Sequence, residues 1–129
     1  METTKEEVTE KELSDMQSYL ETTLSDDPAE LTERLASLNV YLARSGYLLA
    51  VAKNKRDKAV NGVFSEYQKM ILKMPATVAN KFIDSCVEKE NMNVNWLDRM
   101  NRTCVHQGDN IRTLVSFSKE QLRLTKSGY

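Results

Sequence analysis

The sequence predicts an all-α fold, in which a long helical hairpin with coiled-coil-like packing follows a short acidic helix. Residues that favour turns are scarce, since 129 residues include four glycines and two prolines. The alternation of apolar and polar side chains that is typical of strands is hard to find. One set of positions instead recurs in steps of four and three residues, which is the repeat of a long helix packed along a seam. This mostly apolar ladder consists of Leu31, Leu35, Leu38, Leu42, Ser45, Leu49, Ala52, Arg56, Ala59 and Val63.

The first predicted element is a short amphipathic helix. Thr9 and Glu12 have the spacing of a capping box, so we expect the helix to begin at Thr9. Its outer side is acidic, and we assign residues 1–26 to an acidic N-terminal arm and residues 27–129 to the long hairpin domain. The apolar face of this helix consists of Leu13, Met16, Leu20 and Leu24.

The second predicted element is a long helix that begins at Pro28. Asp27 can accept hydrogen bonds from exposed backbone N–H groups, and Pro28 suits the first helical position. No proline follows before Pro75, so nothing forces the helix to end early. We expect one helix from about residue 28 to the low 70s, or a pair of helices broken near Gly62.

The return arm of the hairpin begins after Pro75, which resets the apolar pattern. Glu88 and Glu90 suit a helix terminus better than acid–base chemistry. We predict a loosening or a joint at the three asparagines that follow, because asparagine is a poor helix former. These are Asn91, Asn93 and Asn95. The apolar pattern returns at Trp96 and ends near Leu124.

The length of the second helix predicts self-association. About 40 helical residues span roughly 60 Å, which exceeds the width of a compact domain of this size. Such a helix must pack against another long element or against a second copy, so we expect a homo-oligomer. Ser45 and Arg56, as polar residues within the ladder, would help to set its register. The predicted oligomer seam consists of Leu35, Leu38, Leu42 and Leu49.

Charge is unevenly distributed along the chain. Residues 1–38 contain 11 acidic and 3 basic side chains, whereas residues 39–129 contain 8 acidic and 15 basic ones. A surface for anions such as nucleic acid is one explanation, and solvated faces of exposed helices are the other. If the two long helices run antiparallel, their basic groups could form one stripe along a phosphate backbone. The candidate nucleic-acid-binding residues are Lys53, Lys55, Arg56, Lys58, Arg99, Arg102 and Arg112.

The sequence contains no recognisable catalytic motif, neither a glycine-rich phosphate loop nor a nucleophile elbow. Cys104 and His106 are two residues apart, so they would not face one metal ion from a helix, and Cys86 is isolated. We therefore expect no enzyme activity, no catalytic residues, no metal and no cofactor. Both cysteines are expected to be thiols. No signal peptide or run of 18 apolar residues is found, so a cytoplasmic protein without a membrane partner is predicted.

Three segments carry a resemblance to a known family. They are residues 41–50 (YLARSGYLLA), residues 96–102 (WLDRMNR) and residues 114–120 (LVSFSKE). Over roughly residues 31–124 the chain resembles the UvsY-type recombination mediators of phages. The resemblance implies a ring-forming oligomer that binds single-stranded DNA and helps to load a recombinase, in a bacterial or phage-infected host cell. The acidic arm before Asp27 is not part of the family pattern.

Two other functions remain open. The acidic first helix favours a helical adaptor that binds protein, or a phage counter-defence inhibitor, without nucleic-acid contact. A structural or assembly protein of the virion is a further alternative. Four aromatic side chains could stack on bases, although aromatic residues at helical spacing more often belong to a core. They are Tyr41, Tyr47, Tyr67 and Trp96.

Overall fold

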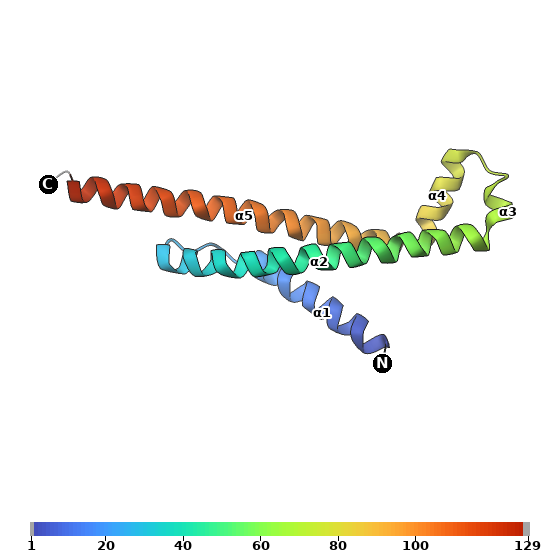
Figure 1. Cartoon of the computed structure of the whole chain (residues 1–129), viewed down its shortest axis with the longest axis horizontal. Coiled ribbons are helices and arrows are strands. Elements are labelled where there is room, and N and C mark those ends of the chain that lie inside the picture. The colour runs from blue at the N-terminus through green and yellow to red at the C-terminus, as the bar shows by residue number, and fades with distance from the viewer. Residues whose placement is uncertain (1, 128–129) are drawn as a thin grey trace. The chain divides into compact units, whose positions relative to one another are not determined.

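The chain folds into helices joined by short connections (Figure 1). The computed structural model describes the backbone of residues 2–127 and the side chains of residues 10–126. No strand occurs among these residues, and the predicted all-α class with a helical hairpin is confirmed, since α2 packs against α5. The helices are α1 (Glu2–Leu20), α2 (Pro28–Glu66), α3 (Gln68–Ile71), α4 (Ala76–Cys86) and α5 (Glu88–Ser127).

The chain divides into two compact units. Unit 1 holds the residues up to 45 together with those from 100 onward, and unit 2 holds residues 46–99. Unit 1 therefore combines α1 with the first part of α2 and the last part of α5. Its core includes Leu13, Met16 and Leu20 of α1, Leu31 and Leu38 of α2, and Met100, Cys104 and Ile111 of α5.

The first helix starts earlier than its capping pattern indicates. α1 begins at Glu2, so the predicted start at Thr9 is wrong. The preceding residues are rich in glutamate and include a lysine, which are good helix formers, and the helix continues through them. The predicted apolar face is confirmed for Leu13, Met16 and Leu20, which are buried. Leu24, the fourth residue assigned to it, lies beyond the end of α1 at Leu20.

The start of α2 agrees with the prediction. The backbone N–H of Ala29 donates to Asp27 Oδ1 at 3.2 Å, and that of Leu31 donates to the Asp27 carbonyl at 2.9 Å. The Ser25 hydroxyl in turn accepts from the N–H of Asp27 at 3.1 Å. Side chain and backbone thus satisfy donors that a helix start leaves without partners.

The predicted end of α2 is wrong in both of its forms. The helix passes through Gly62 without a break, and it ends at Glu66 instead of continuing to the low 70s. A Cβ at Gly62 would meet no atom within 4 Å, so the glycine lies at an open helix surface and does not admit close packing. The chain turns at Tyr67, whose ring meets Phe82 of α4 edge-on at 5.3 Å. Every ladder position is buried or half-buried, which confirms the ladder as the packed face of α2.

The turn into α5 also differs from the prediction. α5 begins at Glu88 and runs without interruption through the three asparagines that were predicted to form a joint. The break lies instead at Val87, a side chain that is buried in unit 2. Buried Val94 and Leu97 hold the helix in place, so the poor helix propensity of asparagine is overridden by packing. Glu88 and Glu90 lie in the first turn of α5, where acidic side chains favour the helix dipole, as predicted.

Helix α2 also resembles a membrane-spanning helix in its length and apolar composition. By length and composition alone, one 18-residue stretch of it could cross a membrane. Core helices of water-soluble proteins pass the same test, so this observation is weak and does not decide where the protein resides.

Candidate functional site

The predicted basic residues of α2 belong to unit 2 and lie within six consecutive positions. Lys53, Lys55 and Lys58 are exposed, whereas Arg56 is half-buried at the ladder and donates to Asp57 Oδ1 at 3.3 Å. The Arg56 charge is thereby largely compensated by its neighbour.

The helical repeat places a tyrosine among these lysines. Residues 47, 51, 54 and 58 follow each other in steps of four and three, so they lie on one face, opposite the ladder. Tyr47 exposes 61% of its surface at one end of this face, and exposed Lys58 lies at the other. Lys55 flanks this face, about 70° around the helix from its centre, whereas Lys53 is about 160° from Lys55 and lies nearer to the ladder than to this face. We call the surface that consists of Tyr47, Val51, Asn54, Lys55 and Lys58 the basic face.

The predicted arginines of α5 are less concentrated. Arg99 belongs to unit 2, whereas Arg102 and Arg112 belong to unit 1. All three are exposed, and Arg112 pairs with Asp109 at 3.1 Å. The ten residue steps from Arg102 to Arg112 correspond to about 15 Å of helix. The lysines of α2 are thus close together along the chain, whereas the arginines of α5 are spread along their helix.

The other candidate stacking aromatics contribute to packing. The rings of Tyr41 and Tyr19 are 4.8 Å apart, and Tyr67 pairs with Phe82. Trp96 is half-buried. Tyr47 is therefore the most exposed of the four candidates. The sequence signal that could have identified a mixed aromatic and basic surface is the helical spacing of Tyr47 from Val51, four residues on, and from Lys58, eleven residues on.

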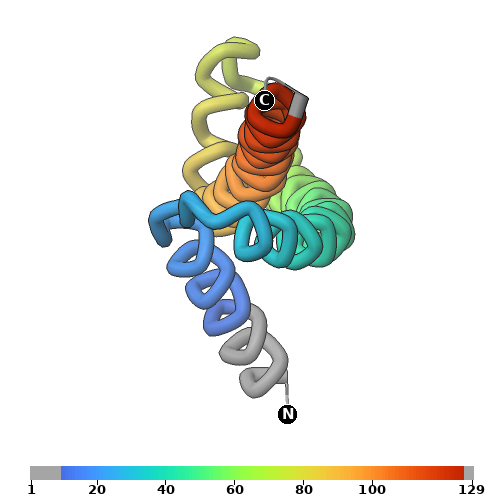
Figure 2. Tube along the Cα trace, turned by 90° about the vertical axis from the view of Figure 1, so that its left-hand side faces the viewer, coloured from blue at the N-terminus to red at the C-terminus, as the bar shows by residue number. Residues whose placement is uncertain are grey.

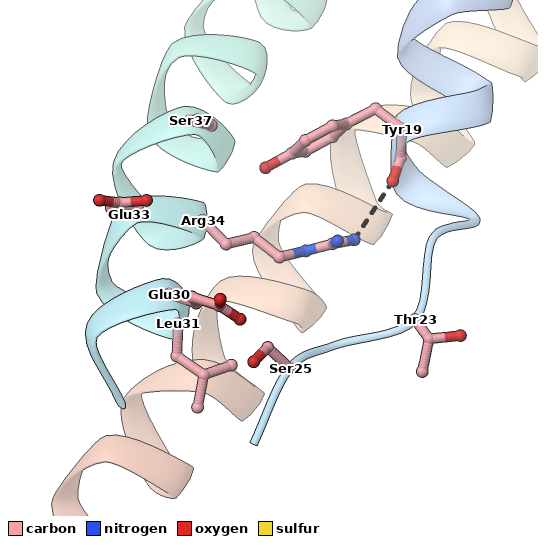
Figure 3. Close-up of a pocket in the computed structure, with 8 residues that line it drawn as sticks. All are labelled: Tyr19, Thr23, Ser25, Glu30, Leu31, Glu33, Arg34 and Ser37. Carbon is pink, nitrogen blue, oxygen red and sulfur yellow. Dashed lines mark hydrogen bonds between the residues drawn. The ribbon is translucent and has the colours of Figure 1, made fainter. Parts of the chain in front are cut away.

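In unit 1, the end of α1 is held by side chains from both long helices. The guanidinium of Arg34 donates to the Tyr19 carbonyl at 3.2 Å (Figure 3). It donates to the Thr22 hydroxyl at 2.7 Å as well. It also lies over the Tyr19 ring, 4.8 Å from its centroid. Gln107 of α5 donates to the Leu20 carbonyl at 2.7 Å and accepts from Arg34. These bonds satisfy carbonyls that the end of a helix leaves unpaired. Sequence reasoning did not identify Arg34 or Gln107, because no spacing rule joins them.

A small pocket of about 290 Å³ lies beside Arg34 (Figure 3). Its lining combines hydroxyl groups with the side chains of Glu30 and Glu33. The cationic group that lines it, Arg34, is committed to α1. The pocket therefore lacks the available positive charge that an anionic ligand would need.

A second contact joins α1 to α2. Arg44 donates two hydrogen bonds to the Glu12 carboxylate, one of them from Nη2 to Oε2 at 2.9 Å. The hydrogen bond from Arg44 holds the pKa of the Glu12 carboxyl below its usual range. Because the folded-state pKa is depressed, the pair stabilises the fold at neutral pH and stops doing so as the pH falls through that pKa.

We therefore expect Glu12→Gln to lower the free energy of unfolding by less than about 1 kcal/mol at pH 7, since the pair is largely exposed. The difference from the wild type should begin to shrink as the pH falls past about 4.3, the value of an unperturbed glutamate, and should vanish below the depressed folded-state pKa, where the carboxyl is protonated in both states. Urea denaturation at several pH values measures this. The control is Glu10→Gln, an exposed residue of α1, which should change little. A deficit that does not shrink between pH 7 and about pH 2 would contradict the ion-pair explanation.

The core between α2 and α5 contains a polar contact. Ser45 is completely buried, and its hydroxyl donates to the Leu42 carbonyl at 3.1 Å. The Asn101 amide donates to the same carbonyl at 3.2 Å and to the Ser45 hydroxyl at 3.0 Å. The sequence predicted that Ser45 would help to set a register, and the structure shows it in the contact between two helices of one chain.

The residues of the predicted oligomer seam pack within the chain. Leu38 is buried, and Leu35, Leu42 and Leu49 are half-buried. A Cβ at Gly108 of α5 would lie 3.6 Å from Leu35 Cδ1, so the two helices approach closely at this level. Packing against α5 thus covers much of the surface that was assigned to a second copy.

The groups that could support catalysis or metal binding are scattered. Among the described residues, no three histidine, cysteine, aspartate or glutamate side chains are placed to hold a metal ion. Both cysteines are free thiols, with Cys86 exposed and Cys104 buried. Burial raises the pKa of the Cys104 thiol, which disfavours the reactive thiolate.

No protein-family model matches this sequence, and no curated protein or solved structure is significantly similar to it. The resemblance to UvsY-type proteins therefore stays an expectation from sequence.

Proposed function

We propose that the protein is an oligomeric accessory protein of phage-type recombination that binds single-stranded DNA and assists the loading of a recombinase. The basic face of α2 is the observation that carries this proposal. It combines the exposed ring of Tyr47 with the exposed Lys55 and Lys58 over twelve residues of helix. Proteins that bind single strands without sequence preference pair stacking aromatics with positive charge in this way.

The chemistry of the basic face divides between two kinds of contact. Lys55 and Lys58 would contact phosphates and release counterions, while the Tyr47 ring would stack on a base. Lys53 would add positive charge at the side of the helix. The face spans only about 16 Å of helix, so one protomer would hold a short stretch of DNA. Several linked protomers would bind a strand far more tightly than one, which gives self-association a role in the function.

The triple variant Lys53→Glu, Lys55→Glu and Lys58→Glu tests the proposal. We expect it to weaken binding of an oligo-dT strand strongly and to reduce the slope of log affinity against log salt by about 1.4, because Lys55 and Lys58 would each contribute about 0.7. Fluorescence anisotropy over a salt series measures both quantities. Circular dichroism should show unchanged helix content, since the three side chains are exposed.

A matched control uses three other exposed lysines of unit 2. The variant Lys69→Glu, Lys73→Glu and Lys81→Glu makes the same change in net charge away from the basic face. It should lower affinity less and leave more of the salt slope intact. If both triple variants bind DNA as tightly as the wild type, nucleic-acid binding by the basic face is refuted.

A protein-binding adaptor is the second candidate, and one specific observation favours it. Several large apolar side chains are exposed around the turns between α2, α3 and α4 in unit 2, outside the contact between the two long helices. They are Phe64, Tyr67, Met70, Leu72 and Val78. Groups of exposed apolar side chains commonly mark protein-binding surfaces. If the assay above refutes DNA binding, the protein-binding adaptor becomes the better explanation.

A further inference from the structure

Helices α3 and α4 form a short helical pair in unit 2, between the end of α2 and the start of α5. Residues 72–75 join the two helices, and so short a connection makes them run in opposite directions. Figure 1 and Figure 2 show α4, coloured yellow, as a helix of its own beside this turn. Ile71 of α3 and Ala79 of α4 are buried, so they mark the inward-facing side of each helix.

One side of this pair presents apolar residues from both helices. The helical repeat places Met70 about 100° around α3 from Ile71, and it places Val78 about 100° around α4 from Ala79. Each of the two precedes its buried neighbour by one residue. Because the helices run in opposite directions, the same offset leads to the same side of the pair. Met70 exposes 42% of its surface and Val78 exposes 49%.

An aromatic contact lies on this side as well. The ring of Tyr67, just before α3, meets the ring of Phe82 edge-on, with 5.3 Å between the centroids. Phe82 follows Val78 by four residues, so the two side chains are neighbours along α4. Tyr67 is 38% exposed and Phe82 is half-buried. We call the surface that consists of Tyr67, Met70, Val78 and Phe82 the α3–α4 face.

Lysines border the α3–α4 face. Lys73 follows Met70 by three residues, in a turn where its backbone N–H donates to the Met70 carbonyl at 3.2 Å. Lys81 follows Val78 by three residues on α4, so it is the neighbour of Val78 on the solvent side. Both lysines are exposed, and residues 67–83 contain no acidic side chain. The border of the face is therefore positive.

The acidic residues on either side of this segment leave that border positive. Glu66 is the last residue of α2, and Asp84 lies about 160° around α4 from Phe82, on the other side of that helix. An apolar face with a positive border is complementary to an apolar surface with a negative border. A second copy of the same face would instead bring lysines against lysines.

We propose that the α3–α4 face binds an acidic amphipathic helix of a partner protein. The apolar side chains of that helix pack on Tyr67, Met70 and Val78, and its carboxylates lie beside Lys73 and Lys81. Tyrosine, phenylalanine and methionine, which make up most of the face, are enriched at protein interfaces. The face is small, so the complex is weak and transient.

A lipid surface fits these residues less well. Tyr67, Met70 and Val78 expose less than half of their surface, so a flat bilayer would reach only their outer parts. Leu72 is 68% exposed, but the helical repeat places it about 160° from Met70, on the other side of α3. Helices that bind membranes collect their exposed apolar residues on one face. The inference goes beyond the proposed function, because it involves no nucleic acid.

Fluorescence anisotropy with a labelled synthetic peptide and the full chain tests the proposal. The probe is a helical peptide of about four turns, with leucines along one face and glutamates elsewhere. One control peptide has lysines in place of the glutamates, and the other has alanines in place of the leucines. The chain should bind the probe with a dissociation constant of roughly 10–300 μM, and each control peptide at least about fivefold less tightly.

Charge variants locate the binding site. The double variant Lys73→Glu and Lys81→Glu should weaken binding of the probe about fivefold or more, because it reverses the border of the face. Lys55→Glu and Lys58→Glu together are the matched control in the same unit. They make the same change in net charge on the basic face of α2 and should leave the affinity for the probe within about twofold.

Apolar variants test the face itself. Met70→Ser and Val78→Ser together should weaken binding of the probe at least about fivefold, because they remove apolar contact area. Leu72→Ser, on the other side of α3, is the control and should change little. Circular dichroism should show unchanged helix content in all these variants, since the replaced side chains are exposed.

Four outcomes would overturn the proposal. The first is equal binding of the glutamate and lysine peptides, and the second is wild-type affinity in either α3–α4 variant. The third is cosedimentation with phosphatidylglycerol vesicles without peptide binding, which would assign the face to a lipid surface. The fourth is a dimer in sedimentation equilibrium that Met70→Ser and Val78→Ser abolish, which would assign it to a second copy. Because no DNA is present, each of these failures is distinct from failure of the DNA-binding proposal.

Discussion

Replacement of Leu38 by alanine should lower the free energy of unfolding by about 2–5 kcal/mol, because it removes a buried side chain and leaves a cavity. Leu38 is 1% exposed and lies in the core of unit 1. Urea denaturation, monitored by circular dichroism, gives this free energy. The slope of the free energy of unfolding against urea concentration should not change. A loss of this size is a large part of the total stability of a small domain.

The control for Leu38→Ala is Val40→Ala on the same helix. Val40 is 67% exposed, and its truncation should change stability by less than about 0.5 kcal/mol. Comparison of the two variants also tests whether the ladder packs within one chain or against a second copy. If Leu38 packed mainly against a second copy, the loss would depend strongly on protein concentration. Packing within one chain predicts the same loss at 1 and 100 μM.

Asn101→Asp should lower the free energy of unfolding by about 2–4 kcal/mol at neutral pH, although it preserves the size and shape of the side chain. The Asn101 amide donates to the Leu42 carbonyl and to the Ser45 hydroxyl. A carboxylate cannot donate either bond, and it places negative charge against the carbonyl oxygen. The control is Asn110→Asp, an exposed residue of α5 in the same unit, which should change stability little.

The pH dependence of Asn101→Asp provides a second measurement. The carbonyl should raise the folded-state pKa of the new carboxyl above its unfolded value of about 3.9. This carboxyl destabilises the fold least at low pH, because it is then protonated and can donate a hydrogen bond as the amide does. The deficit relative to Asn110→Asp should therefore shrink as the pH falls toward about 4. A deficit that does not depend on pH would indicate that lost packing, rather than lost hydrogen bonding, is responsible.

Most of the helical architecture follows from local patterns. The Asp27–Pro28 start, the α4 start after Pro75 and the acidic first turn of α5 each depend on residues within one turn of the site, and all three are confirmed. The apolar ladder likewise fixes which side of α2 is packed, since the repeat of a helix is a local property. The basic face is implied by the same repeat, because the positions opposite the ladder follow once the ladder is known.

Helix breaks were harder to locate from the sequence. Gly62 and the asparagines before Trp96 have low helix propensity, yet α2 and α5 run through them. The chain breaks at Tyr67 and Val87 instead, where an aromatic contact and a buried valine fix the turn. Propensity amounts to about 1 kcal/mol or less per residue, so tertiary packing decides where a helix ends when the two disagree.

The sequence by itself determined that this protein is helical, where α2 and α4 begin and which faces are apolar. Only the tertiary structure decided what covers those faces. A ladder with a repeat of four and three residues fits a second copy or a return helix equally well. Its partner is set by the register of α2 on α5, which the contacts of Asn101 and Gln107 fix across long stretches of sequence. That register covers the α2 ladder and leaves residues 116–126 of α5 largely exposed, because α5 continues beyond the level at which α2 begins.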